Sequence, residues 1–251
     1  MRIVVAPDRA AAAQHAADIV ERFVNSAVAT ALGIATGETM EGPLAEIAGR
    51  CQRGALSLAH TEVYLLDEYV GLKPDDPCSF ASTVNRLLVQ PTDLSPGAMH
   101  GPNPHNPDLY AECADYERRV RAARIGLQLL GIGTNGHIAF NEPGSSLASS
   151  TRVVQLNEQT RSDNARAFPD GTCPPRAAIT QGIATILLAR KLLLVACGQP
   201  KARPVARALE GPVTRSVPAS ALQLHPDVTV VVDPPAAALL ADEPSQPCRQ
   251  A

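Results

Sequence analysis

The sequence contains no tryptophan, and only 3% of its residues are aromatic. Proteins that bind single-stranded nucleic acid stack bases on aromatic side chains, and membrane proteins carry aromatic belts at the bilayer surface. The net charge is only −3, and acidic and basic residues are spread along the chain instead of forming blocks. We therefore predict that the protein binds neither nucleic acid nor a membrane.

Long apolar runs and closely spaced cysteines are also missing. The N-terminus has no apolar segment long enough for a signal peptide, and no later run approaches the length of a membrane span. The six cysteines include no C-x-x-C pair, which is typical of free thiols in a reducing compartment. These absences predict a soluble cytoplasmic protein.

What is present is an alternation of short apolar runs and longer helical patterns. The runs are almost continuously apolar, as strands buried on both faces of a parallel sheet are, and lie at residues 2–6, 32–36, 62–67, 125–133, 191–197 and 228–233. Asp8 and Asp108 are expected to cap two of the intervening helices. The order predicts an α/β fold: a single doubly wound, mostly parallel sheet flanked by helices, Rossmann-like, over residues 1–235.

Two segments do not fit the alternation. Residues 155–185 contain three prolines and form a less regular excursion, for which we predict a lid over a site. Residues 236–251 are rich in proline and polar residues, and we expect them to be a frayed tail.

Ligands of open α/β sheets bind outside the carboxyl ends of the strands. Four polar turns that contain or adjoin glycine follow predicted strands, and they are therefore expected to meet at one edge. They begin at Thr36, at Asp67, at Gly131 and at Gly198.

The third of these turns contains G-x-G-x-x-G at Gly131, Gly133 and Gly136. A dinucleotide site needs a helix directly after the glycines and an acidic residue about 20 residues later. Here Pro143 and Gly144 follow within a few residues, and the window about 20 residues on lacks an acid at a strand end. We therefore expect the glycines to let the backbone approach a small ligand instead.

The same turn carries His137 and Glu142, with Asn135 beside them. A histidine near a ligand moves protons at neutral pH, and a carboxylate fixes its tautomer and stabilises its cationic form. The alternative is that His137 ties the loop to the sheet and Glu142 is a surface acid. A metal site is the weaker interpretation, because no H-E-x-x-H spacing or Cys/His cluster accompanies the pair.

Asp67 closes an apolar strand, where partial desolvation raises a carboxyl pKa and makes the group a competent base. A helix cap or an ion-pair partner remains the alternative. The turn at Thr36, Gly37, Glu38 and Thr39 precedes a helix and can cradle a phosphate, although the G-K-[ST] ending of a P-loop is missing.

Lysine is scarce, with only three in the chain, so Lys201 at the start of a helix after a strand is a second phosphate candidate. A solvated lysine at a helix start is the alternative for this position.

Together these segments resemble the glucosamine-6-phosphate deaminase (isomerase) family over nearly the whole chain. The stretch "GHIAFNEPGSS" is highly specific to that family. The other matching segments are "LLDEYVGL" (65–72), "GIGTNGHIAFNEPGSSLASSTRVV" (131–154), "NEQTRSDNARAF" (157–168), "AITQGIATIL" (178–187), "KARPVARALEG" (201–211) and "PASALQLHPDVTVVVD" (218–233).

The resemblance implies conversion of glucosamine 6-phosphate and water to fructose 6-phosphate and ammonia, without a metal or an organic cofactor. It assigns ring opening to His137, supported by Glu142 and Asn135, and removal of the C2 proton to Asp67. Phosphate binding is implied for the turn from Thr36 to Thr39 (Thr36, Gly37, Glu38 and Thr39), for Arg166 and for Lys201.

The chain departs from the family pattern at several positions. Many relatives have T-G-G-T-P where this chain has Thr36-Gly37-Glu38-Thr39-Met40, so Glu38 must point away from the phosphate or alter its binding. Asn135 stands where some relatives carry aspartate. Arg152 matches a residue of relatives activated by N-acetylglucosamine 6-phosphate, but Val154 replaces a basic one and their C-terminal extension is missing, so neither activation nor a hexamer is implied.

Two alternatives remain at this stage. A sugar-lactone hydrolase of the 6-phosphogluconolactonase type would use His137 as a base for water and give Asp67 no role. A non-catalytic sugar-phosphate sensor would bind through Lys201 and Arg166 without turnover. The sequence leaves the oligomeric state and the epimer preference open.

Overall fold

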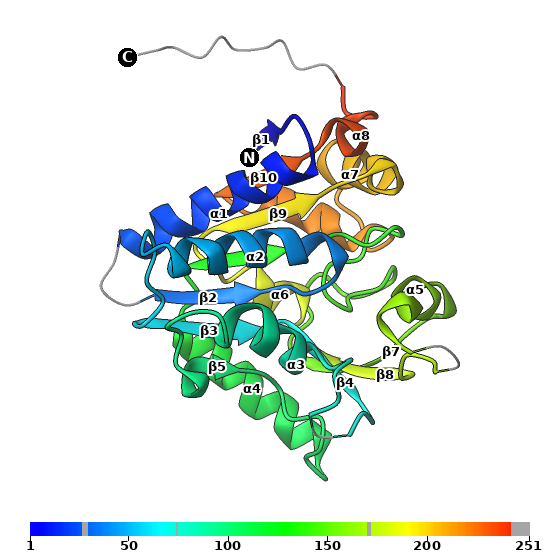
Figure 1. The fold of residues 1–251 in the computed structure, drawn as a ribbon. Coiled ribbons are helices and arrows are strands. Elements are labelled where there is room, and N and C mark those ends of the chain that lie inside the picture. Colours follow the sequence, from blue (N-terminus) through cyan, green and yellow to red (C-terminus); the bar gives the residue numbers. More distant parts are fainter. Residues whose placement is uncertain (27–29, 74, 170–171, 242–251) are drawn as a thin grey trace.

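The computed structural model describes residues 1–26, 30–73, 75–169 and 172–241. A seven-stranded sheet with the order β1-β10-β9-β6-β2-β3-β5 forms its centre, and all of its strand pairs are parallel (Figure 1). The strands are β1 (Arg2–Val5), β2 (Thr30–Ile34), β3 (Thr61–Leu65), β5 (Met99–His100), β6 (Leu127–Leu130), β9 (Leu192–Ala196) and β10 (Val228–Val232). The predicted α/β class is confirmed. Every residue of β6 and β9 is buried, because helices cover both faces of the sheet.

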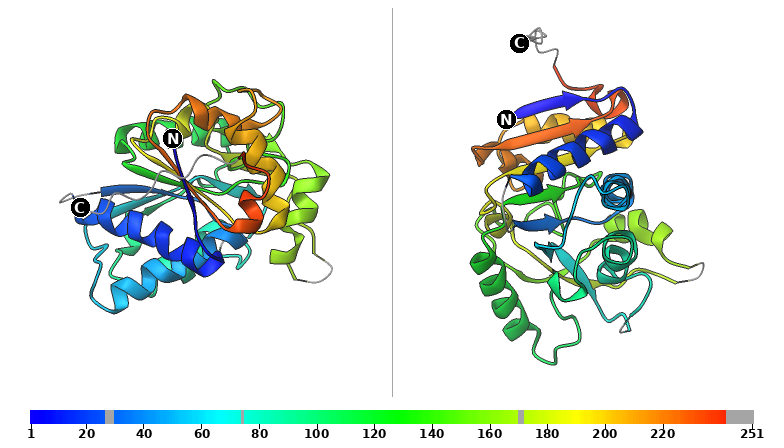
Figure 2. Two further views of the ribbon diagram at one scale, coloured as in Figure 1. Left: turned by 90° about the horizontal axis from the view of Figure 1, so that it is seen from above. Right: turned by 60° about the vertical axis from the view of Figure 1, so that its left-hand side comes forward.

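Two long helices pack against each other on one face of the sheet, α1 (Arg9–Asn25) and α2 (Glu38–Gln52), while α4 (Leu109–Ala123) lies on the opposite face (Figure 2). Asp8 caps α1 by accepting a hydrogen bond from Ala11 N at 2.8 Å. Asp108 caps α4 by accepting from the first backbone N–H groups of that helix, so both predicted caps are present. The shorter helices are α3 (Phe80–Val84), α5 (Glu158–Asn164), α6 (Ile183–Ile186), α7 (Ala202–Leu209) and α8 (Pro234–Ala237).

A second, three-stranded antiparallel sheet was not foreseen. It has the order β4-β8-β7 and consists of β4 (Asp67–Val70), β8 (Ala177–Thr180) and β7 (Arg152–Gln155). Asp67 therefore opens β4 and does not close the strand predicted over 62–67, which ends at Leu65. Tyr69, Phe80, Phe140 and Phe168 form an aromatic cluster beside this sheet, with ring centroids 4.7–5.6 Å from Tyr69.

Glu117 of α4 fastens the segment that leads into β7. Its Oε2 accepts hydrogen bonds from Thr151 N at 2.9 Å, from Thr151 Oγ1 at 2.6 Å and from Thr185 Oγ1 at 2.7 Å. Burial opposes the charge of this carboxylate, but the hydrogen bonds outweigh that effect and hold the pKa of Glu117 below its usual value.

The segment predicted as a lid, 155–185, contains α5, the 3-10 turn Ala165–Ala167 and β8, with residues 170–171 outside the described part. Its role as a lid stays a prediction. Residues 236–241 differ from the expected frayed tail, because they pack against the rest of the domain. Ala236 is fully buried in α8, and Ala241 N donates to Glu210 Oε1 at 2.8 Å. Residues 242–251 lie outside the described residues.

The cysteines in the described ranges, Cys51, Cys78, Cys113, Cys173 and Cys197, carry free thiols. None of the helices in these ranges combines the length and the apolar character that crossing a membrane requires.

Candidate active site

The four polar turns follow strands that are consecutive neighbours in the sheet, in the order β9-β6-β2-β3. Because parallel strands end at the same edge, the segments after them meet there, although the segment after β3 forms β4 of the small sheet and not the predicted turn. The turn after β2 leads directly into α2, whose cap residue Gly37 has φ +104°. The turn after β9 leads into a 3-10 turn, Gln199–Lys201, whose cap residue Gly198 has φ +91°. Both conformations favour glycine.

The glycine-rich loop after β6 has the irregular course that the sequence suggested. Residues 131–151 form turns and an isolated bridge between Ile138 and Asn141, and no helix follows the glycines. Gly133 lies against the imidazole of His137, where a Cβ atom would come within 2.2 Å of the ring carbon Cε1. This loop therefore carries a histidine where a dinucleotide-binding loop would begin a helix.

His137, Asn135 and Glu142 form a hydrogen-bonded chain. The Oδ1 atom of Asn135 lies 2.8 Å from His137 Nδ1 and accepts a hydrogen bond from His137 N at 3.1 Å. The Nδ2 atom of Asn135 donates to Glu142 Oε2 at 2.8 Å. A flipped amide would place its NH₂ group against the backbone N–H of His137, so the network fixes the orientation of Asn135.

This chain determines which ring nitrogen of His137 can accept a proton. Since Nδ1 faces an amide oxygen, it carries the hydrogen, and Nε2 keeps its lone pair in the neutral ring. Burial lowers the pKa of His137 below its usual value of 6.5, although the charge of Glu142, whose Oε2 is 4.0 Å from Nδ1, opposes this shift. The imidazole is therefore held neutral and ready to act as a base at Nε2.

Glu142 is held from two sides. Its Oε2 atom also accepts a hydrogen bond from Asn157 Nδ2 at 2.7 Å, which joins the glycine-rich loop to the residue that caps α5. Its Oε1 atom is buried and finds no hydrogen-bond partner within the described residues. A second link joins the same elements, from Thr134 Oγ1 to Asp163 Oδ2 at 2.7 Å.

Asp67 enters the site from the neighbouring strand end and is 7% exposed. Burial raises the pKa of Asp67 well above its usual value, and the charge of Glu68 raises it further. Glu68 is itself buried and accepts hydrogen bonds from Tyr69 N at 2.8 Å and from Ala81 N at 2.9 Å. Asp67 pairs with Thr180 across the small sheet, and Thr180 Oγ1 accepts from Phe140 N in the loop of His137.

Lys201 points into the site from the turn after β9. Its Nζ atom donates to the backbone oxygen of Ile132 at 2.7 Å, between Gly131 and Gly133. Burial lowers the pKa of Lys201, while the charges of Asp163 and Glu38 oppose this shift. The solvated lysine considered from the sequence is thus not what the structure contains.

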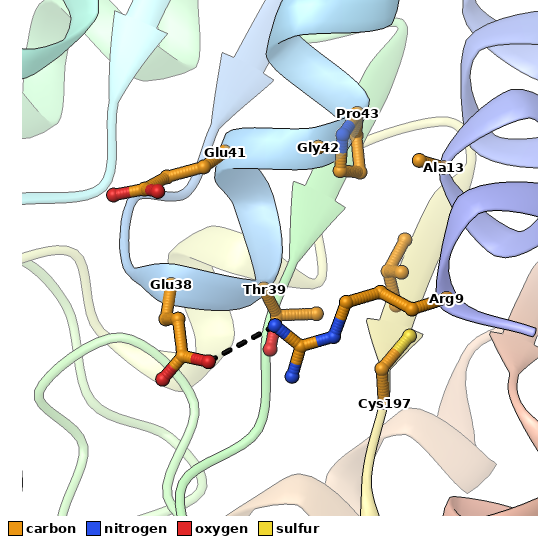
Figure 3. A pocket seen from close by; sticks show the side chains of 9 residues that line it. Arg9, Ala13, Glu38, Thr39, Glu41, Gly42, Pro43 and Cys197 are labelled. Carbon is orange, nitrogen blue, oxygen red and sulfur yellow. Dashed lines mark hydrogen bonds and ion pairs between the residues drawn. The ribbon is translucent and has the colours of Figure 1, made fainter.

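The turn from Thr36 to Thr39 holds an unexpected ion pair. Glu38 does not point away from the cations: its Oε1 atom accepts from Arg9 Nη1 at 2.9 Å, and its Oε2 atom lies 3.8 Å from Arg166 Nη1. Arg9, Glu38 and Thr39 line a pocket between α1 and α2, of which Arg166 is not part (Figure 3). The side chain of Arg166 is 86% exposed.

Sequence reasoning did not identify Arg9, Asn157, Glu68 or Asp163 as site residues. Arg9 follows the first predicted strand, so the rule that ligands bind at strand ends could have identified it. Glu68 directly follows the candidate Asp67, so its position beside that carboxyl was visible in the sequence. Asn157 and Asp163 reach the site through tertiary contacts, for which the sequence carries no local signal.

Comparisons with known proteins agree with this geometry. Residues 7–231 match the family model of glucosamine-6-phosphate isomerases/6-phosphogluconolactonase. The chain is 45% identical to a glucosamine-6-phosphate deaminase of Beutenbergia cavernae over 96% of this chain and 93% of the relative. A solved structure described as a monomeric glucosamine-6-phosphate deaminase is 43% identical, with a TM-score of 0.92 over 95% of this chain and all of that chain.

The 6-phosphogluconolactonase of Leishmania guyanensis superimposes with a TM-score of 0.75 over 96% of this chain and 99% of its own, but is only 18% identical. That likeness extends to the fold alone. The resemblance noted in the sequence is confirmed by the family model and by the relatives above 40% identity. The chain belongs to the family of glucosamine-6-phosphate isomerases and 6-phosphogluconolactonases.

Proposed function

We propose that the protein converts glucosamine 6-phosphate and water to fructose 6-phosphate and ammonia. The observation that carries the proposal is the hydrogen-bonded chain of His137, Asn135 and Glu142, at the same sheet edge as the buried carboxyl of Asp67. His137 and Asp67 are thus two separate proton-transfer groups, and an isomerisation that begins with ring opening requires two such groups. The similar chains named glucosamine-6-phosphate deaminase support this reaction.

The first step opens the pyranose ring. The Nε2 atom of neutral His137 accepts the proton of the anomeric hydroxyl and returns a proton to the ring oxygen as the C1–O5 bond breaks. Glu142 stabilises the imidazolium that forms between these transfers, through the amide of Asn135. The product is the open-chain aldehyde.

The second step moves the carbonyl from C1 to C2. Asp67 removes the C2 proton while the C1 carbonyl oxygen takes up a proton, which gives an enolamine. A proton is then added at C1. The resulting C2 imine is hydrolysed by one water molecule, which leaves the ketone and releases ammonia. Every step transfers protons and bonding pairs without a net change in oxidation state, so this scheme routes no step through a metal or an organic cofactor.

The phosphate group is held by the turn from Thr36 to Thr39, by Lys201 and by Arg166. Backbone N–H groups at the start of α2 point toward an anion, and a lysine or an arginine adds a full positive charge. Lys201 donates one hydrogen bond to a backbone carbonyl, and its ammonium group has two further N–H donors for the phosphate.

Ammonia release from glucosamine 6-phosphate tests the proposal. The wild-type protein should release ammonia stoichiometrically with fructose 6-phosphate. Asp67→Asn should lower kcat at least about 10²-fold, the usual scale for a general base, while Glu62→Gln at the other end of β3 serves as the carboxylate control. Hydrolysis of 6-phosphogluconolactone without ammonia release would favour the lactonase alternative, and ligand binding without any turnover would favour the sensor.

A further inference from the structure

Arg9 lies between the two turns to which phosphate binding is assigned. It is the first residue of α1, and its Nη1 atom donates to Glu38 Oε1 at 2.9 Å in the turn after β2. Its Nη2 atom is 3.9 Å from where a Cβ atom on Gly198 would lie, in the turn that leads to Lys201. In the close-up, the guanidinium extends from α1 toward Glu38, past Thr39 and Cys197 (Figure 3).

The carboxylate of Glu38 forms ion pairs with two arginines of this region. One carboxylate oxygen faces Arg9 and the other faces Arg166, so two guanidinium groups from α1 and from the 165–167 turn converge on one carboxylate. The pair between Arg9 and Glu38 is exposed, with 55% and 64% of the two side chains accessible. Because exposed ion pairs contribute little to stability, an incoming anion can open this pair at small cost.

We propose that Arg9 is a phosphate-binding side chain and that Glu38 occupies its guanidinium until the 6-phosphate of the substrate displaces the carboxylate. The proposal rests on the proposed function, because it assigns a further residue to the same substrate. A phosphate monoester carries nearly two negative charges and three acceptor oxygens, so it competes well with a single carboxylate for a guanidinium that binds in a bidentate way. Glu38 then weakens the affinity for every phosphorylated ligand, and Arg9 strengthens it.

A double-mutant cycle on the full chain tests this assignment. The variants are Arg9→Ala, Glu38→Gln and the double variant, with Arg22→Ala as the control for an exposed arginine on the same helix. The measured quantity is the Kd for 2-amino-2-deoxyglucitol 6-phosphate, an open-chain mimic that needs no ring opening. The unphosphorylated 2-amino-2-deoxyglucitol is measured beside it.

Arg9→Ala should raise the Kd of the phosphorylated mimic about 10- to 150-fold, the range for one charge-assisted contact, and leave that of the unphosphorylated mimic unchanged. Glu38→Gln should lower the Kd of the phosphorylated mimic about two- to fivefold, the scale of an exposed ion pair. In the Glu38→Gln background, Arg9→Ala should still weaken binding at least about tenfold, because the guanidinium then contacts the phosphate without competition.

Three results would overturn the proposal. The first is a Kd for Arg9→Ala equal to that for Arg22→Ala. The second is a loss that disappears in the Glu38→Gln background, which would mean that Arg9 only neutralises Glu38. The third is an equal loss for both mimics. If the wild-type protein releases ammonia and Arg9→Ala binds the phosphorylated mimic normally, the role of Arg9 is refuted and the proposed function is retained. If the wild-type protein releases no ammonia, the proposed function is refuted, and the binding cycle alone then tests the role of Arg9.

Discussion

Replacing Gly133 with alanine perturbs the position of His137 without touching its chemistry. A Cβ atom on Gly133 would lie 2.2 Å from His137 Cε1, whereas carbon atoms in contact stay at least about 3.5 Å apart. The imidazole must therefore retreat by at least about 1.3 Å. A movement of this size breaks the 2.8 Å contact between His137 Nδ1 and Asn135 Oδ1.

The expected loss follows from that displacement. A catalytic group misplaced by about 1 Å costs on the order of 10²-fold in rate, so Gly133→Ala should lower kcat for ammonia release by about that factor or more. Gly97 provides the control, because it is exposed and lies outside the site, a Cβ atom there would meet only Ser95 Oγ at 3.9 Å, and neither glycine has a positive φ. Gly97→Ala should change kcat by less than about twofold, the scale of a neutral surface change.

Two further measurements complete the experiment. Thermal unfolding of both variants should show that the fold is retained, and binding of 2-amino-2-deoxyglucitol 6-phosphate should be affected much less than kcat, since the open-chain mimic needs no ring opening. Equal kcat values for Gly133→Ala and Gly97→Ala would show that turnover does not depend on where the ring of His137 lies, and the ring-opening assignment would then be wrong.

Three further predictions concern carboxylates. Burial lowers the pKa of His137 and the charge of Glu142 raises it, so Glu142→Gln should lower this pKa. The limb of the pH profile of kcat/KM that reports protonation of His137 should therefore move to lower pH. An unchanged limb would show that the charge of Glu142 does not act on His137. Glu68→Gln removes a charge that helps burial to raise the pKa of Asp67, so the limb for ionisation of Asp67 should also shift to lower pH, and a shift to higher pH would contradict the assigned cause. Glu117→Ala leaves three donors without their acceptor and should lower the free energy of unfolding by about 3 kcal/mol near neutral pH, measured by urea titration. Because the pKa of Glu117 is lowered in the folded state, this difference should shrink as the pH falls below its usual value of 4.5, and a difference independent of pH would refute the role of its charge.

Six of the seven strands of the large sheet were predictable as apolar runs, and the central β6 and β9 are buried on both faces. The two-residue strand β5 was not predicted, because it is too short to form such a run. The small sheet was not predicted, because its strands are short and carry polar residues: β4 begins with Asp67 and Glu68, and β7 begins with Arg152. Its pairing joins segments far apart in the sequence, which no local pattern encodes. The helix α8 was not predicted either, because Pro234 and Pro235, which suggested a break, occupy its first turn, a position that tolerates proline.

Some contacts of the candidate site could be predicted from the sequence, and others could not. His137, Asn135 and Glu142 lie within one loop, so their proximity was visible in the sequence, and the structure adds the bond pattern that fixes the tautomer. The contact of Asn157 with Glu142 and the pairing of Arg9 with Glu38 depend on how α5 and α1 pack, which their own residues do not specify.

The position of β1 has a consequence for how the chain is made. This strand lies at the edge of the large sheet and pairs with β10, so Arg2 is the register partner of Thr229 (Figure 1). On the ribosome, β1 emerges first, but its backbone hydrogen bonds can form only after β10, the last strand of the described residues, has been synthesised. Contacts of such long sequence separation form slowly, and the interval is one in which unpaired strand edges favour aggregation. The pairing of β1 with β10 therefore forms only when synthesis of the chain is almost complete, and not when the N-terminal half has appeared.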